Sequence, residues 1–178
     1  AEKQAEELAA ALKKDPYRVA ELKKSEKKRN PAPPFTTSTL QQESNRKLGF
    51  SARKTMSVAQ KLYEGIDIGD GSVGLITYMR TDSVVLSKDA TDEARQVITD
   101  RFGADYALKK PRVFKNKAKN AQEAHEAIRP TSVANTPEKV KPYLTAEQFK
   151  LYRLIWLRTV ASQMASAILD ATSVDIVS

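Results

Sequence analysis

A proline-rich segment, NPAPPF at residues 30–35, restricts most strongly how this chain can fold. Each proline fixes its own φ angle at about −65° and lacks an amide hydrogen, so a regular helix cannot continue through the segment. We therefore expect a domain boundary near residue 36, with different structure on its two sides.

The residues before this boundary predict a helix followed by a strand. Residues 1–14 are strong helix formers that Pro16 should stop, and in residues 17–29 Tyr17 and Val19 alternate with polar residues as in an exposed strand. Residues 167–178 return to a strand pattern, and we expect them to pair with residues 17–29. The residues between would then form a helical insertion. Because the chain begins without Met and stops within a strand pattern, we expect a fragment of a longer protein.

The residues after the boundary predict mainly helices. Ser38 or Thr39 is expected to cap a first helix that Gly49 closes, and Ser51 to cap a second that Gly65 closes. Such a pair on a tight turn resembles a helix-turn-helix, although ordinary helix packing is the simpler interpretation. The buried stripe of the second helix should contain Met56, Ala59, Leu62 and Tyr63.

Two longer helices are predicted further along the chain. Ser87 should cap a helix over residues 88–102, and Thr145 with Gln148 forms a capping box that begins a long amphipathic helix. Their buried positions follow helical spacing and should be Ala90, Ala94, Val97, Ile98, Leu151, Leu154, Ile155, Trp156 and Val160.

Two stretches between these helices carry other signals. Residues 65–74 contain four glycines and predict a mobile loop with too few carboxylates for a calcium site. Residues 109–119 carry six basic side chains and no acid, which fits either a solvated loop or a loop that faces phosphates.

The composition favours a polyanionic partner. The chain has 30 Lys and Arg against 22 Asp and Glu, a formal net charge of +8, so nucleic acid is the first candidate. It has no cysteine and a single histidine, which excludes thiolate zinc sites and His-rich metal clusters. No apolar run reaches the about 20 residues of a membrane span, and there is no signal peptide and no GxxxxGK[ST] motif. We expect a cytoplasmic protein that binds DNA and uses neither a membrane nor ATP.

Tyr78, within GLITYMRTDS at residues 74–83, is the candidate nucleophile. A phenol with a pKa of about 10 is a poor nucleophile at neutral pH, so packing in a strand is the simpler interpretation. However, residues i and i+2 of an extended segment lie on one face, which would place Arg80 beside Tyr78. A guanidinium favours the phenolate and can bind a phosphate with two hydrogen bonds, as phosphoryl transfer requires. Thr77 and Thr81 add hydroxyls that would face the opposite side.

His125 and Arg129 are the remaining candidates. They lie four residues apart in QEAHEAIRP, where we predict a short helix over residues 120–130 that Pro130 ends. On one helical face both could contact the same phosphate, although a histidine packed on a helix surface is the simpler interpretation.

Four segments, in this order, resemble the signature segments of the bacterial type IA DNA topoisomerases: PPFTTSTLQQ, KTMSVAQKLYEG, GLITYMRTDS and QEAHEAIRP. The resemblance extends from about residue 30 to about residue 165. It implies that Tyr78 is the active-site tyrosine, that Arg80 positions the phosphate and that His125 binds the scissile region. Gln60 and Glu64 match a helix that the family places beside the tyrosine. The resemblance implies DNA contacts by Arg80, His125, Arg129, Thr77, Thr81, Gln60 and Glu64.

The resemblance further implies transesterification of one DNA strand. The Tyr78 oxygen would attack a backbone phosphorus to leave a 5′-phosphotyrosine and a free 3′-hydroxyl, and rejoining would relax negative supercoils without ATP. In the family, Mg²⁺ is held by an acidic cluster of a toprim domain that has no counterpart in this sequence. We therefore expect no metal site in this chain and no relaxation by this chain alone. Its partners would be DNA, single-stranded at the cleavage site, and the remaining domains of the same enzyme.

The fold implied by the resemblance is mainly α with a minor β part. A multihelical gate domain with the active-site tyrosine, residues 37–165, would be inserted into a strand-rich arch domain of which residues 1–36 and 166–178 are pieces. The expected location is the bacterial cytoplasm, at the nucleoid. Two alternatives stay open: a non-catalytic helix-turn-helix-like nucleic-acid-binding module, and a helical protein-interaction domain.

Overall fold

The computed structural model describes residues 2–13, 16–69, 71–115 and 126–177. The chain divides into two compact units: the ribbon unit, residues 1–29 with 166–178, and the helical unit, residues 30–165. Among the described residues, helices dominate and sheet pairing is small, which confirms the predicted mainly α class.

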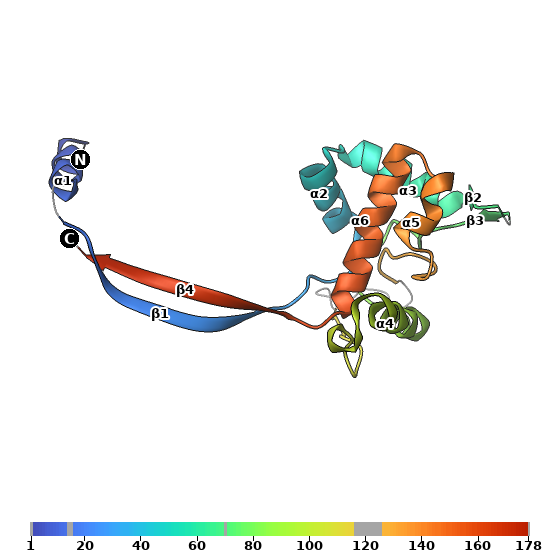
Figure 1. Cartoon of the computed structure of the whole chain (residues 1–178). Helices are drawn as coiled ribbons and strands as arrows, with labels where there is room; N and C mark the ends of the chain where they lie inside the picture. Colours follow the sequence, from blue (N-terminus) through green and yellow to red (C-terminus); the bar gives the residue numbers. More distant parts are fainter. Residues whose placement is uncertain (1, 14–15, 70, 116–125, 178) are drawn as a thin grey trace. The chain divides into compact units, whose positions relative to one another are not determined.

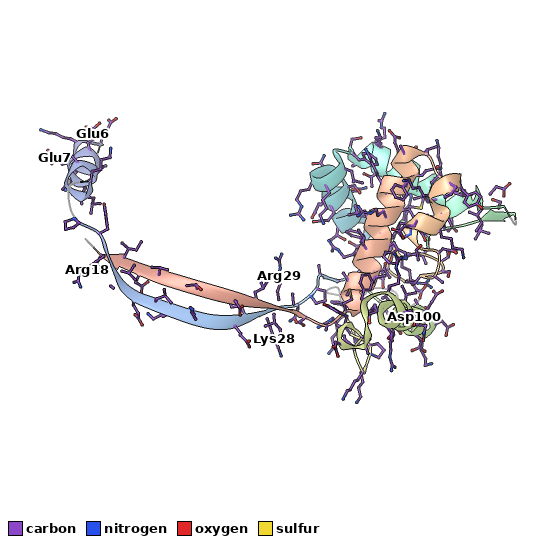
Figure 2. The ribbon with its side chains drawn as sticks, in the orientation of Figure 1. Glu6, Glu7, Arg18, Lys28, Arg29 and Asp100 are labelled. Carbon is purple, nitrogen blue, oxygen red and sulfur yellow. The ribbon has the colours of Figure 1, made fainter. Side chains whose placement is uncertain are left out.

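The ribbon unit contains α1 (Glu2–Leu12) and two long strands, β1 (Arg18–Arg29) and β4 (Ala167–Val177). The strands pair antiparallel, as predicted, with a bulge between Val19 and Glu21 (Figure 1). None of the residues in these three elements is buried. The charged side chains of β1 project from the ribbon, as Figure 2 shows for Arg18, Lys28 and Arg29.

The helical unit begins after the proline-rich segment. Its α-helices are α2 (Thr37–Leu48), α3 (Ala52–Glu64), α4 (Lys88–Phe102), α5 (Pro137–Val140) and α6 (Ala146–Gln163). Two single 3₁₀ turns, η1 (Ala104–Tyr106) and η2 (Lys141–Tyr143), follow α4 and α5, and two short strands, β2 (Ile66–Asp67) and β3 (Ser72–Val73), follow α3. No helix in the described part of the chain is long and apolar enough to cross a membrane.

Local capping explains where three of the helices begin. Ser51, Ser87 and Thr145 each accept a hydrogen bond from the backbone N–H three residues later, which confirms these three predicted caps. At Thr145 the side chain of Gln148 returns a hydrogen bond to the cap N–H, which completes the predicted capping box.

The predicted cap of α2 is wrong. Thr36 caps the helix, and the side chain of Thr39 accepts from the Thr36 N–H. Residues 36–39 all carry hydroxyl side chains, so the sequence pattern does not show which of them caps the helix. Phe35, directly before the cap, is fully buried. Gly49 closes the helix in the left-handed region, at φ 68°, as its position predicts.

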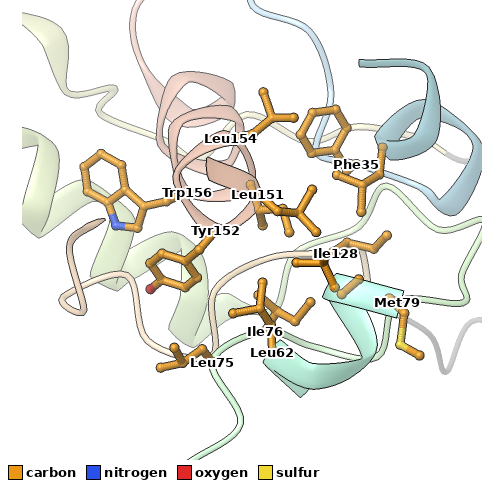
Figure 3. Packing of buried hydrophobic residues seen from close by; sticks show 14 of the residues in the cluster. Phe35, Leu62, Leu75, Ile76, Met79, Ile128, Leu151, Tyr152, Leu154 and Trp156 are labelled. Atoms are coloured by element: carbon orange, nitrogen blue, oxygen red, sulfur yellow. The ribbon is translucent and has the colours of Figure 1, made fainter. Parts of the chain in front are cut away.

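The core lies between α6, α3 and the segments that follow Gly74 and precede Pro130 (Figure 3). The predicted core positions of α6 are buried, whereas Tyr63 is 41% exposed and its place in the predicted stripe is wrong. The buried residues of α3 are Thr55, Val58, Ala59 and Leu62. Two large polar side chains of the core are hydrogen-bonded: the Trp156 indole N–H donates to Val133 O at 2.8 Å, and the Tyr152 hydroxyl donates to Asn135 O at 2.5 Å.

Two predicted local structures differ from the fold. Residues 126–130 are extended rather than helical, because the Ile128 N–H donates to Phe35 O at 2.8 Å and Ile76 forms a bridge with Pro130. These long-range backbone pairings stabilise the extended form of residues 126–130 over the helix that the local sequence favours. Residues 65–74, predicted as a loop, contain the β2–β3 hairpin.

Candidate active site around Tyr78

Tyr78 is a surface residue between buried neighbours. Its side chain is 45% exposed, whereas Met79 is 1% exposed and Leu75 and Ile76 are fully or almost fully buried. The apolar neighbours hold the segment on the core, and the phenol points outward from it. Tyr78 is therefore exposed on the surface of this chain.

The backbone before Tyr78 is fixed by residues 126–130. The Thr77 N–H donates to Arg129 O at 2.9 Å, and the Thr77 hydroxyl donates to Ala127 O at 2.7 Å. The same hydroxyl accepts from the Arg129 N–H at 3.0 Å. The Thr77 hydroxyl, predicted to contact DNA, therefore forms hydrogen bonds with the backbone of Ala127 and Arg129.

The backbone after Tyr78 is fixed by the first residue of α2. The Thr37 hydroxyl donates to Met79 O at 2.8 Å and accepts from the Thr81 N–H at 2.9 Å, and the Thr37 N–H donates to Thr81 O at 2.9 Å. The hydroxyl of Thr81 accepts from the Ser83 N–H at 3.1 Å. The backbone around Tyr78 is therefore held from both sides by segments distant in sequence.

Tyr63 makes a direct contact with the candidate nucleophile. The two rings meet edge to face, with centroids 5.3 Å apart and planes at 60°. Sequence reasoning placed Tyr63 in the core and missed this contact, because α3 turns that side chain toward the surface. Gln60 and Glu64, on the same helix, bond to each other: the Gln60 amide donates to Glu64 Oε1 at 2.6 Å.

Arg80 is exposed and makes no hydrogen bond or ion pair with the other described residues. The backbone bends at Met79, so the segment is not a regular strand between Tyr78 and Arg80. The exposure of both side chains and the burial of Met79 between them agree with a shared face. The pairing of Arg80 with Tyr78 stays a prediction.

Arg129 is occupied by partners within the fold. Its Nη2 lies 2.6 Å from Glu126 Oε2, its Nε donates to the same oxygen at 3.2 Å, and its Nη1 donates to Pro130 O at 2.8 Å. Its side chain is only 12% exposed. A DNA contact by Arg129 stays a prediction, and it would require exchange of these partners.

Glu126 is the acidic centre of this cluster. Burial raises the pKa of its carboxyl, but hydrogen bonds from Arg129 and Ser87 outweigh burial and hold the pKa below its usual value. Glu126 therefore stays ionised and keeps Arg129 in place against the segment that anchors Thr77.

Two predicted features cannot be placed on this site. His125 and residues 116–119 of the basic loop lie outside the described residues. The helix that would have put His125 and Arg129 on one face is wrong for residues 126–130, so that argument no longer supports a shared phosphate. The described residues contain no group of three His, Cys, Asp or Glu that could hold a metal ion.

Comparison with known proteins identifies the family of this chain. The family model described as DNA topoisomerase matches residues 1–178. The chain is 61% identical to DNA topoisomerase 1 of Xylella fastidiosa over 89% of this chain and 20% of that protein. It is 52% identical to DNA topoisomerase 1 of Rickettsia bellii over 99% of this chain and 22% of that protein.

The fold gives the same result. The structure of full-length topoisomerase I from Thermotoga maritima matches with a TM-score of 0.80 at 46% identity, over 94% of this chain and 26% of that one. The chain thus spans about a fifth of the length of the relatives it matches. Because the family model covers all of its residues and the relatives exceed half identity, this chain belongs to the DNA topoisomerase family.

Proposed function

We propose that this chain carries the nucleophile of a type IA DNA topoisomerase, and that Tyr78 is that nucleophile. One observation carries the proposal: Tyr78 is exposed on a backbone that Thr37 and Arg129 fix from two sides. An attacking oxygen benefits from such pre-orientation because less freedom is lost when the substrate binds. The helix-turn-helix alternative is not favoured, because it leaves this arrangement unexplained.

The reaction proposed is an exchange of phosphodiesters. The Tyr78 oxygen attacks a backbone phosphorus and gives up its proton, the bond from phosphorus to the 3′-oxygen breaks, and that oxygen leaves as a hydroxyl. One phosphodiester is replaced by another, so the reversal needs no ATP. Arg80 would stabilise charge on the non-bridging oxygens. His125, Thr77, Thr81, Gln60 and Glu64 stay proposed DNA contacts.

The remaining parts of the enzyme would come from outside this chain. We infer that residues 37–165 are the gate domain and that residues 1–36 and 166–178 are pieces of the arch domain. The Mg²⁺ of the family would be bound by another domain of the longer enzyme. The chain alone is then expected to relax nothing, and the complete enzyme to act on single-stranded sites of nucleoid DNA in the bacterial cytoplasm.

The test is Tyr78→Phe in the complete enzyme. This change removes only the phenolic oxygen and keeps the ring against Tyr63. We expect loss of plasmid relaxation and of the covalent protein–DNA complex, with DNA binding retained. Tyr106→Phe, at another exposed tyrosine on η1, is the matched control and should leave relaxation unchanged. Plasmid relaxation by the Tyr78→Phe enzyme would contradict the proposal.

A further inference from the structure

A groove of about 420 Å³ lies between the C-terminal end of α2 and the outer face of α6. Four basic side chains line it: Lys47, Lys150, Arg153 and Arg158. Among the described residues that line it there is no acid. The groove belongs to different elements from those that contact the Tyr78 ring, so it is a second candidate surface in the helical unit.

The contributions of α6 form one stripe along the helix. Lys150, Arg153, Leu157 and Ala161 follow one another at intervals of three or four residues, which places them on one side. From Lys150 to Arg158 the helix rises about 12 Å at about 1.5 Å per residue. The cations of α6 are therefore spread along the helix rather than gathered at one point.

The charge of the groove is not neutralised within the fold. Lys47 and Arg158 share one carboxylate, Glu43, at 3.2 and 3.5 Å. Lys150 and Arg153 are exposed and make no ion pair with the described residues. Glu43 does not line the groove and also pairs with Arg46, so the charges of Lys150 and Arg153 are not neutralised by the described residues.

Arg158 gives the groove a fixed wall. Its guanidinium donates to Pro33 O at 3.2 Å and lies 4.2 Å from the centroid of the Phe35 ring. It therefore connects α6 to the proline-rich segment and is held in position before any ligand arrives. The exposed side chains of Lys150 and Arg153 can rearrange to contact a ligand.

The floor of the groove is apolar. Leu48 and Leu154 are largely covered, whereas Leu157 is 42% exposed between the cations. A small anion would gain nothing from these leucines, but a nucleotide chain presents apolar sugar and base faces between its phosphates. Membership of the DNA topoisomerase family favours a DNA strand over an acidic peptide as the source of such a ligand.

We propose that this α2–α6 groove binds a segment of single-stranded DNA, with Lys150 and Arg153 on its phosphates and Leu157 against a sugar or base. The proposal rests on family membership and on the charge of the groove. It does not rest on the chemistry of Tyr78, so loss of one proposal leaves the other standing.

The test is the salt dependence of binding by the complete 178-residue chain. Fluorescence anisotropy with labelled oligothymidylate, over a series of NaCl concentrations, gives the slope of log K against log salt. Lys150→Gln with Arg153→Gln should reduce the slope by about 1.4, or about 0.7 for each lost phosphate contact. Both residues are exposed, so the variant should fold; circular dichroism checks this.

The matched control removes the same charge elsewhere. Arg95→Gln with Lys139→Gln changes exposed residues on α4 and α5 that do not line the groove. Its slope should equal that of the unmodified chain, and an equal loss in this control would overturn the proposal. Polyglutamate that competes as well as the oligonucleotide would also overturn it, since the site would then accept any polyanion.

Lys150→Gln with Arg153→Gln should also be tested in the complete enzyme. There the slope should again fall by about 1.4. An unchanged slope in the complete enzyme would show that another part of the longer protein covers the groove, and the proposal would be wrong.

Discussion

Gly74 determines how Tyr63 meets Tyr78. A Cβ at Gly74 would lie 2.6 Å from the carbonyl oxygen of Tyr63, closer than side-chain carbons approach backbone. The absence of that carbon lets the strand-like segment run against the end of α3, where the Leu75 N–H donates to Leu62 O at 2.7 Å. The ring contact between Tyr63 and Tyr78 follows from this close approach.

Tyr63 should therefore act as a positioning residue. An edge-to-face pair contributes about 0.5–1.5 kcal/mol beyond its area, so Tyr63→Leu should lower the rate of DNA cleavage about 2- to 12-fold. The effect should fall on kcat rather than on KM, because the ring orients Tyr78 instead of binding DNA. Single-turnover cleavage by the complete enzyme measures it.

Tyr63→Phe is the control for that experiment, since it keeps the ring and removes only the hydroxyl. It should cleave at nearly the unmodified rate. If Phe is as slow as Leu, the hydroxyl matters and not the ring contact. If Leu is as fast as the unmodified enzyme, Tyr63 has no positioning role.

At the scale of helices and strands, the features that could be predicted from sequence are those that depend on residues close together in the chain. Ser51, Ser87 and Thr145 cap helices through bonds to residues three positions away, so a short window contains the whole interaction. The pairing of β1 with β4 was also predictable, because both segments show a strand pattern: Tyr17 and Val19 alternate with polar residues, and residues 167–178 return to that pattern. Tyr78 itself stands out through its motif.

Long-range pairing explains what sequence reasoning missed. Residues 126–130 have helix-forming residues, yet hydrogen bonds to Phe35 and Thr77 hold them extended. The role of Thr37 is hidden for the same reason, since its partners Met79 and Thr81 lie more than forty positions away. The support of the candidate site consists mainly of such contacts.

Glu93 provides a test of that support. Its carboxylate, on α4, accepts from the Ser132 hydroxyl and the Val133 N–H at 2.6 Å each and from the Ala134 N–H at 3.2 Å. Glu93→Gln replaces one acceptor oxygen by a donor and leaves an N–H unmatched. We expect a loss of about 1–3 kcal/mol in the free energy of unfolding, measured by urea denaturation.

The pH dependence of that stability has a defined sign. Burial raises the pKa of Glu93, but bonds from Ser132 and from the Val133 and Ala134 amides outweigh it and set the pKa below its usual 4.5. The pKa of Glu126 is lowered too. A carboxyl with a depressed pKa stabilises the fold above its unfolded value and stops doing so as pH falls through the folded value. The urea midpoint should therefore drop below about pH 4.5.

Glu93→Gln should flatten that drop, because one of the titrating groups is gone. Asp105→Asn, at an exposed carboxyl on η1, is the control and should leave the midpoint at pH 7 unchanged. A Glu93→Gln curve parallel to that of the unmodified chain would contradict the assigned role.

For the whole molecule, the two units differ in what stabilises them. The helical unit surrounds a continuous core that contains fully buried Leu40, Leu62 and Ile155. In the ribbon unit, α1, β1 and β4 bury no residue, and their charged side chains face outward (Figure 2). A two-stranded ribbon without a core is marginally stable in water.

Hydrogen exchange on the full chain should therefore separate the units. Amides of β1 and β4 are expected to exchange quickly, because their bonds open without exposing a core, whereas the amides of Thr77, Ile128 and α6 should open only with unfolding of the helical unit. Adding urea below the midpoint should accelerate the second group and leave the first nearly unchanged. Equal protection of both groups would mean that the ribbon unfolds together with the helical unit, and that the strands obtain their stability from the same core that holds Tyr78 in place.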